Sequence, residues 1–406
     1  MKRTTHILCG WMIDGSGGSV REKTVMTIVD GRIGDIEPYR VDDRPADVEL
    51  VDFSHCTVLP PLVDSHVHLF MSGTTNLVDR ERQLVAGYDE LRPIIRQHLH
   101  YLFSHGVLAA RDGGDRGGAA LRFRSEEEGL EEMILKVAGR AWRREDRYGS
   151  LIGRGPRVGE SLVEAYLREN EESDHVKLVN SGLNSLNVFG KETPPQFTRQ
   201  EISGLVQAAA NDNRTVMVHA NGREPVRLAV EAGCHSIEHG FFMGMENLQS
   251  MAERGTFWVP TLFTMKAYGA NAGFIRTDAD KKVIDQNLNH QLEQLTMARE
   301  LGVKVALGTD AGSLGVLHGE SLVEEMKLFK KAGYSLPETV QCATSRGAEL
   351  LGLDDFGLLT KGNRATFLIS RGSPAQLPRK LSYLEGIYVD GQPSSLYRKN
   401  PIKYVN

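Results

Sequence analysis

The sequence predicts an α/β protein: a (β/α)8 barrel of the TIM type, with a small β-sandwich domain built from both chain ends. Two observations support this class. Between residues 60 and 355, short apolar runs alternate with longer segments that have the period of an amphipathic helix. Both ends are instead rich in short strand-like runs and in glycine. The first pattern is typical of parallel strands covered by helices, and the second of antiparallel strands joined by tight turns.

The middle of the chain contains eight apolar runs, each followed by a candidate helix, which is the number that a (β/α)8 barrel requires. Among the helices, we expect amphipathic ones at 281–301 and 320–332. An open doubly wound sheet is the alternative, but no glycine-rich phosphate loop follows the first run, so the barrel is favoured. The runs lie at 62–68, 106–112, 133–139, 175–180, 215–220, 235–240, 256–261 and 303–310.

The two chain ends are predicted to pair with each other. Asp30-Gly31 near the N-terminus and Asp390-Gly391 near the C-terminus mark hairpin turns between strand-like runs. The simplest arrangement joins both ends in one sandwich, with the barrel inserted between them. This divides the chain into three parts: the first part of the sandwich at 1–57, the barrel at 58–358, and the second part of the sandwich at 359–406.

Composition indicates an ordinary globular protein of 406 residues, 40% hydrophobic and 25% charged. The net charge of −5 gives no reason to expect nucleic acid or an anionic membrane as a partner, and no segment reaches the roughly 18 apolar residues of a membrane span. The four cysteines are scattered and the first residues lack a signal-peptide core, so we expect a cytoplasmic protein with reduced thiols. The expected partner is a small-molecule substrate, and the sequence leaves a homo-oligomer open.

Polar side chains stand at the ends of the predicted strands, where such a barrel carries its chemistry. Because side chains alternate along a strand, His66 and His68 share a face. The outer face would bury two imidazoles against helices without a partner, so we expect both to point into the barrel mouth. Asp64, one layer deeper, is expected to orient a ligand or to satisfy the barrel interior. The predicted metal site comprises His66, His68, Lys177, His219, His239 and Asp310.

A lysine among these residues favours two metal ions over one. An inward Lys177, deprived of water, has its pKa lowered from about 10.4, so that it can present a neutral amine. Carbon dioxide then adds to give a carbamate, a carboxylate-like bridge with two oxygens. We expect two Zn²⁺ or other divalent ions about 3.5–4 Å apart, sharing a hydroxide. The first ion is assigned to His66, His68, Asp310 and carbamylated Lys177, and the second to His219, His239 and the same carbamate.

The chain resembles the amidohydrolase superfamily over nearly its full length, through its HVH motif, its inward lysine, two later single histidines and the stretch GTDAG. The stretches VLPPLVDSHVHL, HVKLVNSG, VEAGCHSIEHG and WVPT are similar to the prolidase-type and Xaa-dipeptidase branch. The resemblance implies a binuclear zinc hydrolase with Asp310 as the general base. Asp310 would take a proton from the bridging hydroxide as it attacks a carbonyl, and then pass it to the leaving nitrogen.

Two positions near the predicted ligands bear on the substrate. Asn221 follows His219 where the family often carries a tyrosine or histidine that contacts the substrate. An asparagine can donate a hydrogen bond but cannot act as an acid, so ordinary dipeptide specificity is not implied. His318, eight residues after Asp310, matches a His-Gly pair of relatives and is expected to line the pocket without being a ligand.

An arginine-rich loop at 140–157 follows the third strand, where the family tends to have a glycine-rich, histidine-containing stretch. Residues 136–157 contain seven basic and two acidic side chains. Such a run is as often a solvated surface, but a loop after strand three overhangs the catalytic face. On strand two, Arg111 either assists from the barrel or pairs with Asp112 or Asp115. The loop residues considered for binding a substrate carboxylate are Arg140, Arg143, Arg144 and Arg147.

Three functional hypotheses follow. The leading one is hydrolysis of an amide C–N bond in a small, carboxylate-bearing substrate: an N-acyl or N-carbamoyl amino acid or a dipeptide. The second is a mononuclear deaminase or imidazolone-type cyclic amide hydrolase, which lacks the lysine bridge and uses a glutamate after strand five; Glu224 is the candidate. The third is an inactive barrel that serves as a scaffold or binding protein. Such a barrel is expected to lose ligands, whereas all six positions are occupied here.

Overall fold

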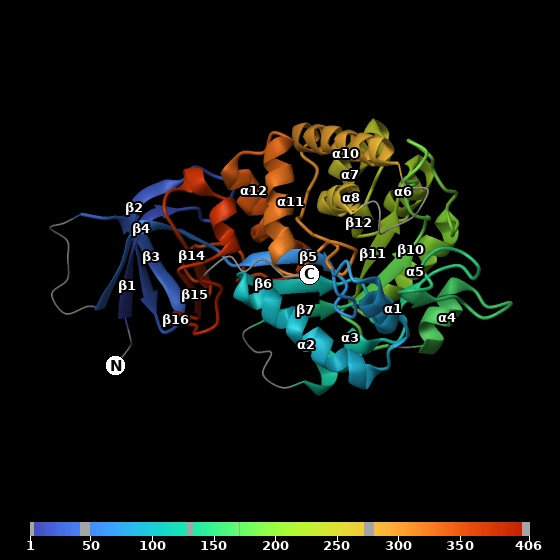
Figure 1. The fold of residues 1–406 in the computed structure, drawn as a ribbon, viewed down its shortest axis with the longest axis horizontal. Coiled ribbons are helices and arrows are strands. Elements are labelled where there is room, and N and C mark those ends of the chain that lie inside the picture. The colour runs from blue at the N-terminus through green and yellow to red at the C-terminus, as the bar shows by residue number, and fades with distance from the viewer. Residues whose placement is uncertain (1–3, 41–48, 128–132, 170, 272–279, 400–406) are drawn as a thin grey trace.

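The computed structural model describes residues 4–40, 49–127, 133–169, 171–271 and 280–399, and Figure 1 shows a β-rich end beside a larger α/β body. The predicted α/β class is confirmed. No helix within these described ranges is long and apolar enough to cross a membrane.

The β-rich end is a seven-stranded sheet to which both chain ends contribute, in the order β16-β15-β14-β4-β1-β2-β3. Antiparallel pairing of Leu368 with Leu59 joins the two ends. All seven strands belong to one sheet, so the predicted pairing of the ends is confirmed, whereas a two-layer sandwich is not. The strands are β1 (Thr4–Met12), β2 (Arg21–Val29), β3 (Arg32–Pro38), β4 (Glu49–Leu59), β14 (Phe367–Arg371), β15 (Gly386–Val389) and β16 (Gln392–Pro393).

Two predicted hairpin turns are present in this sheet. Asp30 and Gly31 have φ angles of 50° and 78°, and Asp390 and Gly391 have φ angles of 48° and 75°. Positive φ at both central residues is what a two-residue type I′ turn requires, and Asp-Gly accepts it at low cost. The sheet also has a hydrophobic core of its own, which contains Ile7, Met26, Val58, Phe367 and Ile369.

The α/β body contains the parallel strands that carry the candidate site. They form two sheets, one in the order β5-β6-β7 and one in the order β13-β12-β11-β10-β8-β9. Seven of the eight predicted runs contain a strand, and two further short strands, β8 and β9, lie within the arginine-rich loop. The strands are β5 (Leu62–Val67), β6 (Val107–Asp112), β7 (Ile134–Val137), β8 (Ala141–Trp142), β9 (Gly153–Arg154), β10 (His175–Val179), β11 (Thr215–Ala220), β12 (Ser236–His239) and β13 (Phe257–Val259).

The eighth predicted run, 303–310, is not a continuous strand, but it connects the two sheets. On one side Trp258 N donates to Lys304 O at 2.9 Å, and on the other Ser65 N donates to Leu307 O at 3.0 Å. The segment leaves the strand conformation at its end, where Asp310 has a φ of 59°. The structure therefore has the parallel strands of a barrel-type fold without one continuous eight-stranded sheet.

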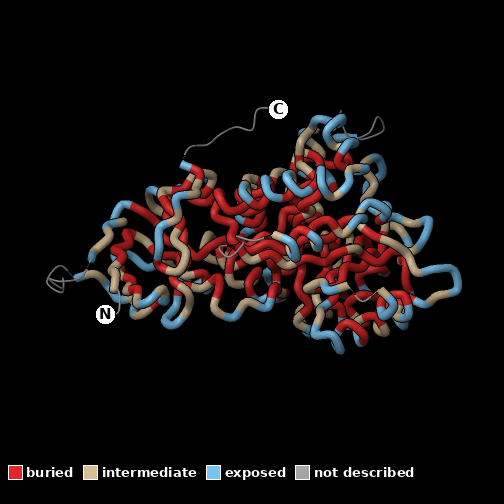
Figure 2. The backbone as a smooth tube through the Cα atoms, turned by 90° about the horizontal axis from the view of Figure 1, so that it is seen from below, coloured by how far each residue is buried: buried red, intermediate tan, exposed pale blue. Residues whose placement is uncertain are grey.

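Helices cover the outside of the parallel strands, and Figure 2 shows buried residues running through the interior of the body. Both helices predicted by residue range are present, since α10 spans Lys281–Leu301 and α11 spans Glu320–Lys331. The other helices are α1 (Leu77–Val85), α2 (Tyr88–Ser104), α3 (Ala119–Glu126), α4 (Leu162–Glu169), α5 (Arg199–Asn211), α6 (Arg223–Glu231), α7 (Met245–Arg254), α8 (Leu262–Ala270), α12 (Leu336–Ala343) and α13 (Ser345–Leu351).

Candidate metal centre

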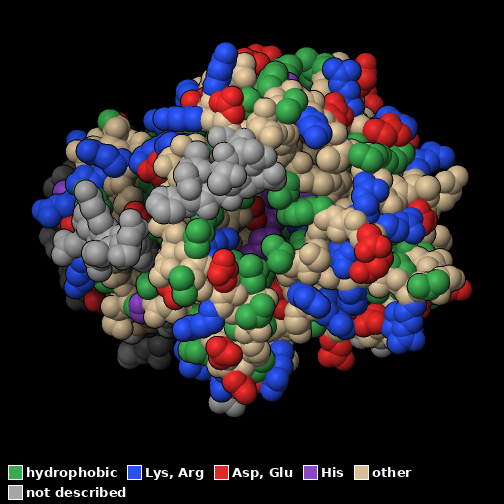
Figure 3. All heavy atoms as spheres, turned by 45° about the vertical axis from the view of Figure 1, so that its right-hand side comes forward, with side chains coloured by type: hydrophobic (Ala, Val, Ile, Leu, Met, Phe, Trp, Pro, Cys, Tyr) green, Lys and Arg blue, Asp and Glu red, His purple; other side chains and the backbone are tan. Residues whose placement is uncertain are grey.

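Two histidines of the first parallel strand meet an aspartate of segment 303–310. His66 lies in β5 and His68 directly follows it, with their ring centroids 5.4 Å apart. Asp310 Oδ1 lies 3.6 Å from His66 Nε2 and 3.5 Å from His68 Nε2. One donor atom from each residue lies within 4.8 Å of the others, a spacing that one metal ion can bridge. Figure 3 shows histidine side chains at the floor of a hollow in this face.

Asp64 holds the segment that carries Asp310. Its Oδ1 accepts a hydrogen bond from Thr309 N at 2.9 Å, and its Oδ2 accepts one from Thr309 Oγ1 at 2.6 Å. Burial raises the pKa of Asp64 to about 7. Of the two roles expected for Asp64, the structure therefore places it within the interior, where it fixes the residue before Asp310.

Two further histidines complete a cluster of four imidazoles. His219 is the residue before the last in β11, and His239 is the last residue of β12. Their ring centroids are 4.7 Å apart. His239 also lies 5.0 Å from His66 between ring centroids. His239 has a φ of 66°, an uncommon backbone conformation for a residue with a side chain, and such strain is concentrated at functional sites.

Lys177 lies in β10 with 1% of its surface exposed. Its Nζ is buried and makes no hydrogen bond to any described residue. Burial lowers the pKa of Lys177 to about 8, against the opposing influence of Glu238. Its charge in turn lowers the pKa of His66 and of His219, so it lies beside the imidazole cluster. The structure thus brings together all six residues that the sequence predicts as ligands, while their role as ligands stays a prediction.

The chemistry of this cluster fits divalent metal ions. Burial lowers the pKa of His68 to about 4 and that of His219 to about 3, so the rings are neutral and keep a lone pair for a metal. His66 Nε2 and Lys177 Nζ are buried without a hydrogen-bond partner among the described residues. A buried polar atom without a partner is costly, and a metal or a modification would relieve that cost. Imidazole nitrogen and carboxylate oxygen are ligands that Zn²⁺ accepts.

Hydrogen bonds from the chain orient the histidine rings and leave one nitrogen of each available. His68 Nδ1 contacts Gly114 O at 2.9 Å, and His239 Nδ1 contacts Thr261 Oγ1 at 2.7 Å. These contacts leave Nε2 of both rings for a ligand. His219 is the exception, because its Nε2 lies 3.1 Å from Gly182 O and its Nδ1 is left. A carbonyl that receives one ring N–H fixes the tautomer in this way.

A buried ion pair, absent from the sequence-based prediction, lies behind His66. His66 Nδ1 contacts Glu238 Oε2 at 2.7 Å, and Glu238 Oε1 accepts a hydrogen bond from Arg111 Nη2 at 2.8 Å. Arg111 also donates to Ser65 O at 2.8 Å. The expectation that Arg111 pairs with Asp112 or Asp115 is therefore wrong. Glu238 precedes His239, and the sequence gives no sign that β6 brings a guanidinium to it.

Replacing Glu238 with glutamine is expected to destabilise the protein by about 3–5 kcal/mol, because it leaves the Arg111 guanidinium buried without a counter-charge. It should also weaken zinc binding by about 10–100-fold through the lost orientation of His66. Chemical denaturation of the metal-free protein measures the first effect and competition with a chelator the second. Glu324→Gln is the control, since Glu324 pairs with Lys266 at the surface, where such pairs contribute little. Equal effects of the two substitutions would contradict this role.

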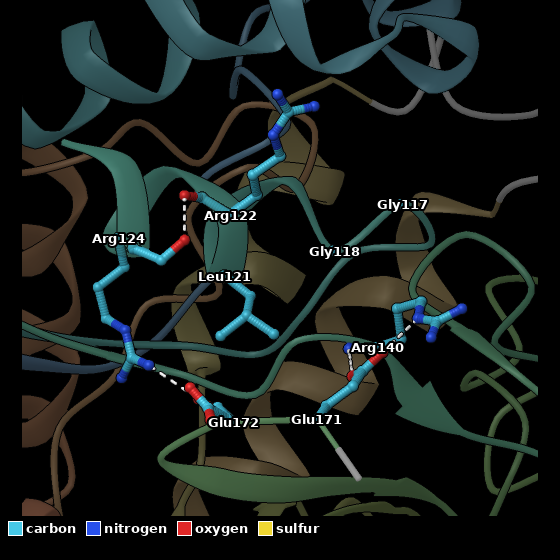
Figure 4. Close-up of a pocket in the computed structure, with 9 residues that line it drawn as sticks. Gly117, Gly118, Leu121, Arg122, Arg124, Arg140, Glu171 and Glu172 are labelled. Carbon is cyan, nitrogen blue, oxygen red and sulfur yellow. Dashed lines mark hydrogen bonds and ion pairs between the residues drawn. The ribbon is translucent and has the colours of Figure 1, made fainter. Parts of the chain in front are cut away.

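The four arginines considered for substrate binding, in the loop after β7, all have partners within the chain. Arg140 pairs with Glu169 and Glu171. Arg140 and Glu171 line the pocket beside α3 that Figure 4 shows, and none of the six predicted ligands lines that pocket. Arg143 pairs with Glu145 at 3.0 Å. The structure thus anchors these two guanidinium groups on carboxylates, as a structural surface loop would.

Arg144 and Arg147 connect the same loop to α5 and to the segment before it. Arg144 Nη2 donates to Glu201 Oε1 at 2.6 Å, and its Nε donates to Gln196 O at 3.1 Å. Arg147 Nη2 donates to Pro194 O at 2.9 Å. Substrate binding by these arginines stays a prediction, and their present contacts explain their conformation without a substrate.

The remaining substrate candidates are held by backbone contacts. Asn221 Oδ1 accepts a hydrogen bond from Phe241 N at 3.0 Å, which links two strand ends. His318 stacks on His98 with a centroid distance of 4.0 Å, and its Nε2 lies 3.2 Å from His68 O, so it supports the backbone of a predicted ligand. Glu224 lies on α6 and pairs with Arg227 at 2.7 Å.

The chain is similar to several known proteins. A model of the amidohydrolase family matches residues 57–399. Ochratoxinase of Aspergillus niger is 26% identical over 180 residues, 44% of this chain, and the match spans only 36% of that relative's length. Imidazolonepropionase of Salinispora arenicola is 24% identical over 404 residues, which cover 92% of this chain and 91% of that protein. The structure of an Xaa-Pro dipeptidase with bound methionine superposes with a TM-score of 0.80 and 25% identity, covering 96% of this chain and 99% of that one.

Proposed function

Because the chain belongs to the amidohydrolase family, whose members are metal-dependent hydrolases, we propose that it cleaves the C–N amide bond of a small, carboxylate-bearing substrate. Similarity to the Xaa-Pro dipeptidase supports the prolidase-type branch that the sequence resembles. The observation that carries the proposal is the convergence of four imidazoles, one carboxylate and one buried amine without a partner on one site.

The proposal includes two divalent ions, with zinc as the expected metal, and a carbamylated Lys177 between them. The neutral amine of Lys177 would add to carbon dioxide, forming a new N–C bond and releasing one proton to solvent. When bound, such ions supply a Lewis acid for the substrate carbonyl and a water molecule of lowered pKa. The other ligands are divided between the ions: His66, His68 and Asp310 for the first, and His219 and His239 for the second.

Asp310 is the proposed general base and acid. Ser313 Oγ donates to its Oδ2 at 2.9 Å, which leaves Oδ1 facing His66 and His68. Burial raises the pKa of Asp310 to about 6, close enough to neutrality for it to accept a proton from the attacking water. The same carboxyl can then return that proton to the leaving nitrogen, which otherwise departs as an unstable anion.

The proposed substrates are N-acyl or N-carbamoyl amino acids and dipeptides. The dipeptidase named above supports an amide bond next to a carboxylate as the target class. Asn221 uses its side-chain oxygen to hold Phe241 N, which supports a specificity unlike that of relatives with a tyrosine or histidine there.

A mononuclear deaminase or imidazolone-type hydrolase is the second candidate, and the similarity to an imidazolonepropionase supports considering it. That mechanism needs a glutamate beside the metal, in the segment that follows β11, the fifth predicted strand of the barrel. Glu224 does not meet this need, because its side chain is 53% exposed and paired with Arg227. The presence of a buried Lys177 favours the two-metal site over this candidate. An inactive scaffold is disfavoured because the described residues retain all six donors.

The function is tested by counting metals and screening substrates together. Zinc-loaded protein is expected to hold about two equivalents per chain and to release amine from members of a panel of N-acyl amino acids, N-carbamoyl amino acids and dipeptides. Removal of the metal should abolish this release, and added zinc should restore it. One equivalent of zinc with an unmodified Lys177 in the mass spectrum would favour the mononuclear candidate. Release that survives complete metal removal, or no release by the loaded protein, would contradict the proposal.

The proposal also covers how the chain is organised and where it acts. We propose a hydrolase barrel at 58–358 between the two parts of the end domain, 1–57 and 359–406. We further propose that the protein acts in the cytoplasm on a small molecule, without nucleic acid or membrane as a partner. A homo-oligomer is compatible with this activity, and light scattering of the purified chain decides that point.

A further inference from the structure

Arg80 is a partly buried cation that the described residues leave without a counter-charge. It lies on α1, in the connection that follows β5, and its Nη1 donates to Ser72 O and, at 3.0 Å, to Gly312 O. No carboxylate of the described residues lies within 4.0 Å of its nitrogens, and no hydrogen bond from its Nε or Nη2 is made to them. Desolvating a guanidinium is costly, so a site that does this without an internal partner is suited to an external anion.

This guanidinium stands at the candidate metal centre. Gly312, which Arg80 contacts, is two residues after Asp310. Burial lowers the pKa of Arg80, and the nearby charges of Tyr268 and Asp310 act against that lowering. Arg80 is thus close to the proposed general base without forming an ion pair with it.

Three other arginines of the α/β body are neutralised by carboxylates of the chain itself. Arg111 pairs with Glu238, Arg140 with Glu169 and Glu171, and Arg144 with Glu201. Arg80 instead donates hydrogen bonds from one nitrogen to two carbonyl oxygens. These bonds fix the plane of its guanidinium but do not neutralise its charge. The Nε–H and Nη2–H groups together form the fork that matches the two oxygens of a carboxylate.

Two tyrosines border the same region. Tyr268 lies on α8, and its hydroxyl is close enough to Ser313 to hydrogen-bond with it. Burial raises the pKa of Tyr268 to about 12, so its hydroxyl remains a donor at neutral pH. Tyr148 packs on His219 with a ring centroid distance of 5.1 Å, and its pKa is raised by burial and by the nearby charges of Tyr268 and Asp310. The two tyrosines and Arg80 thus all lie near Asp310.

We propose that Arg80, assisted by the Tyr268 hydroxyl, is the subsite that binds the substrate carboxylate. This inference rests on the proposed function, whose substrate class it specifies. It assigns to α1 the role that the sequence suggested for Arg140, Arg143, Arg144 and Arg147.

The test compares N-acetyl amino acids with their carboxamides, which differ only in the carboxylate. Arg80→Gln in the zinc-loaded enzyme is expected to raise KM for the acids by about 10–100-fold, the range for loss of charge-assisted hydrogen bonds. It should change KM for the carboxamides less than about threefold and leave kcat within a few-fold. Arg80→Lys keeps the charge without the fork and should recover part of the lost affinity. Arg82→Gln on the same helix is the matched control, because Arg82 is exposed, and it should change neither KM.

A binding experiment without turnover tests this inference separately from the proposed hydrolysis. Ligand-observed NMR with the metal-free protein measures Kd for N-acetyl-L-phenylalanine and N-acetyl-L-phenylalaninamide without any turnover. The parent is expected to prefer the acid, and Arg80→Gln to remove that preference, even where the loaded enzyme hydrolyses neither probe. Equal weakening of both probes would make Arg80 a structural clamp of α1 and overturn the inference. So would a parent with no preference for the acid, or a preference lost in Arg144→Ala rather than in Arg80→Gln.

Discussion

Replacing Asp310 with asparagine is expected to lower kcat by about 10²–10⁴-fold, the range that general acid–base catalysis contributes, while zinc remains bound. Asparagine has the shape of aspartate and one oxygen donor, but its amide cannot accept a proton at neutral pH. Both oxygens of Asp310 are defined in the structure, Oδ2 by Ser313 and Oδ1 by its approach to two imidazoles. The side chain of Asp310→Asn should therefore keep its position, so a displacement of that side chain is not expected to account for the loss of kcat.

Steady-state kinetics and elemental analysis of the same preparation make this test decisive. The asparagine variant should keep about two zinc ions and nearly the parent KM. Glu325→Gln is a matched control: Glu325 is a buried carboxyl that accepts hydrogen bonds from Leu262 N and Phe263 N and not from a predicted metal ligand. It undergoes the same change of carboxyl to amide and should keep kcat within a few-fold. Parent-like turnover by Asp310→Asn would show that another group is the base.

The dependence of kcat on pH tests the role of the Asp310 carboxyl independently. Burial raises the pKa of Asp310 to about 6 in the metal-free site. Because only the deprotonated form accepts a proton, kcat of the zinc-loaded enzyme should fall at acidic pH, with a midpoint no higher than that value. Bound cations favour the carboxylate, so they move this acid limb to lower pH and never to higher pH.

The fold class and the clustering of the donors follow from features that are local in the sequence. His66 and His68 are two residues apart, which places them on one face of a strand whatever surrounds it. Asp30-Gly31 encodes a hairpin turn within two residues, and the structure has that turn. The helical periods at 281–301 and 320–332 are likewise properties of single segments, and both helices are present.

What the sequence did not predict depends on contacts between segments far apart in the chain. Arg111 and Glu238 are 127 positions apart and lie on strands of different sheets, so no local pattern links them. The arginine-rich loop has a basic composition, but two of the glutamates that neutralise it, Glu169 and Glu201, come from α4 and α5. Arg80 carries no motif, and only its contact with Gly312 brings it to the centre. Segment 303–310 was predicted as a full strand, whereas its links to Asp64 and to two sheets give it an irregular course.

Replacing Lys177 with methionine is expected to reduce bound zinc from about two equivalents to one or fewer and to lower kcat by at least about 10³-fold. Methionine matches the length of the lysine stem and suits a buried position, but it cannot form a carbamate. Elemental analysis after zinc loading with and without added bicarbonate measures the effect. The parent should depend on bicarbonate for its full metal content, and the variant should not. Two tightly bound ions in Lys177→Met would contradict the bridging role.

Lys136→Met on β7 is the matched control for this substitution. Lys136 lies 3.7 Å from Asp174 and keeps 33% of its side chain exposed, so its amine is solvated and has a counter-charge nearby. The control should bind zinc and turn over substrate like the parent. Its stability should change by less than about 1 kcal/mol, as is usual for exposed ion pairs.

Lys177→Met should also raise the free energy of unfolding of the metal-free protein. A substitution that lowers activity but raises stability identifies a functional lysine, whereas loss of a structural lysine would lower stability. Burial lowers the pKa of Lys177 from 10.5 to about 8, which corresponds to a folding cost on the order of 3 kcal/mol. Between these two values the unfolded chain binds more protons than the folded chain, so the stability of the parent rises with pH. The gain in the variant should therefore be complete below about pH 8 and disappear toward pH 10.5. Denaturation of both metal-free proteins at pH 7 and pH 10 measures it, and a variant less stable than the parent at pH 7 would mean that the Lys177 amine has a stabilising partner in solution.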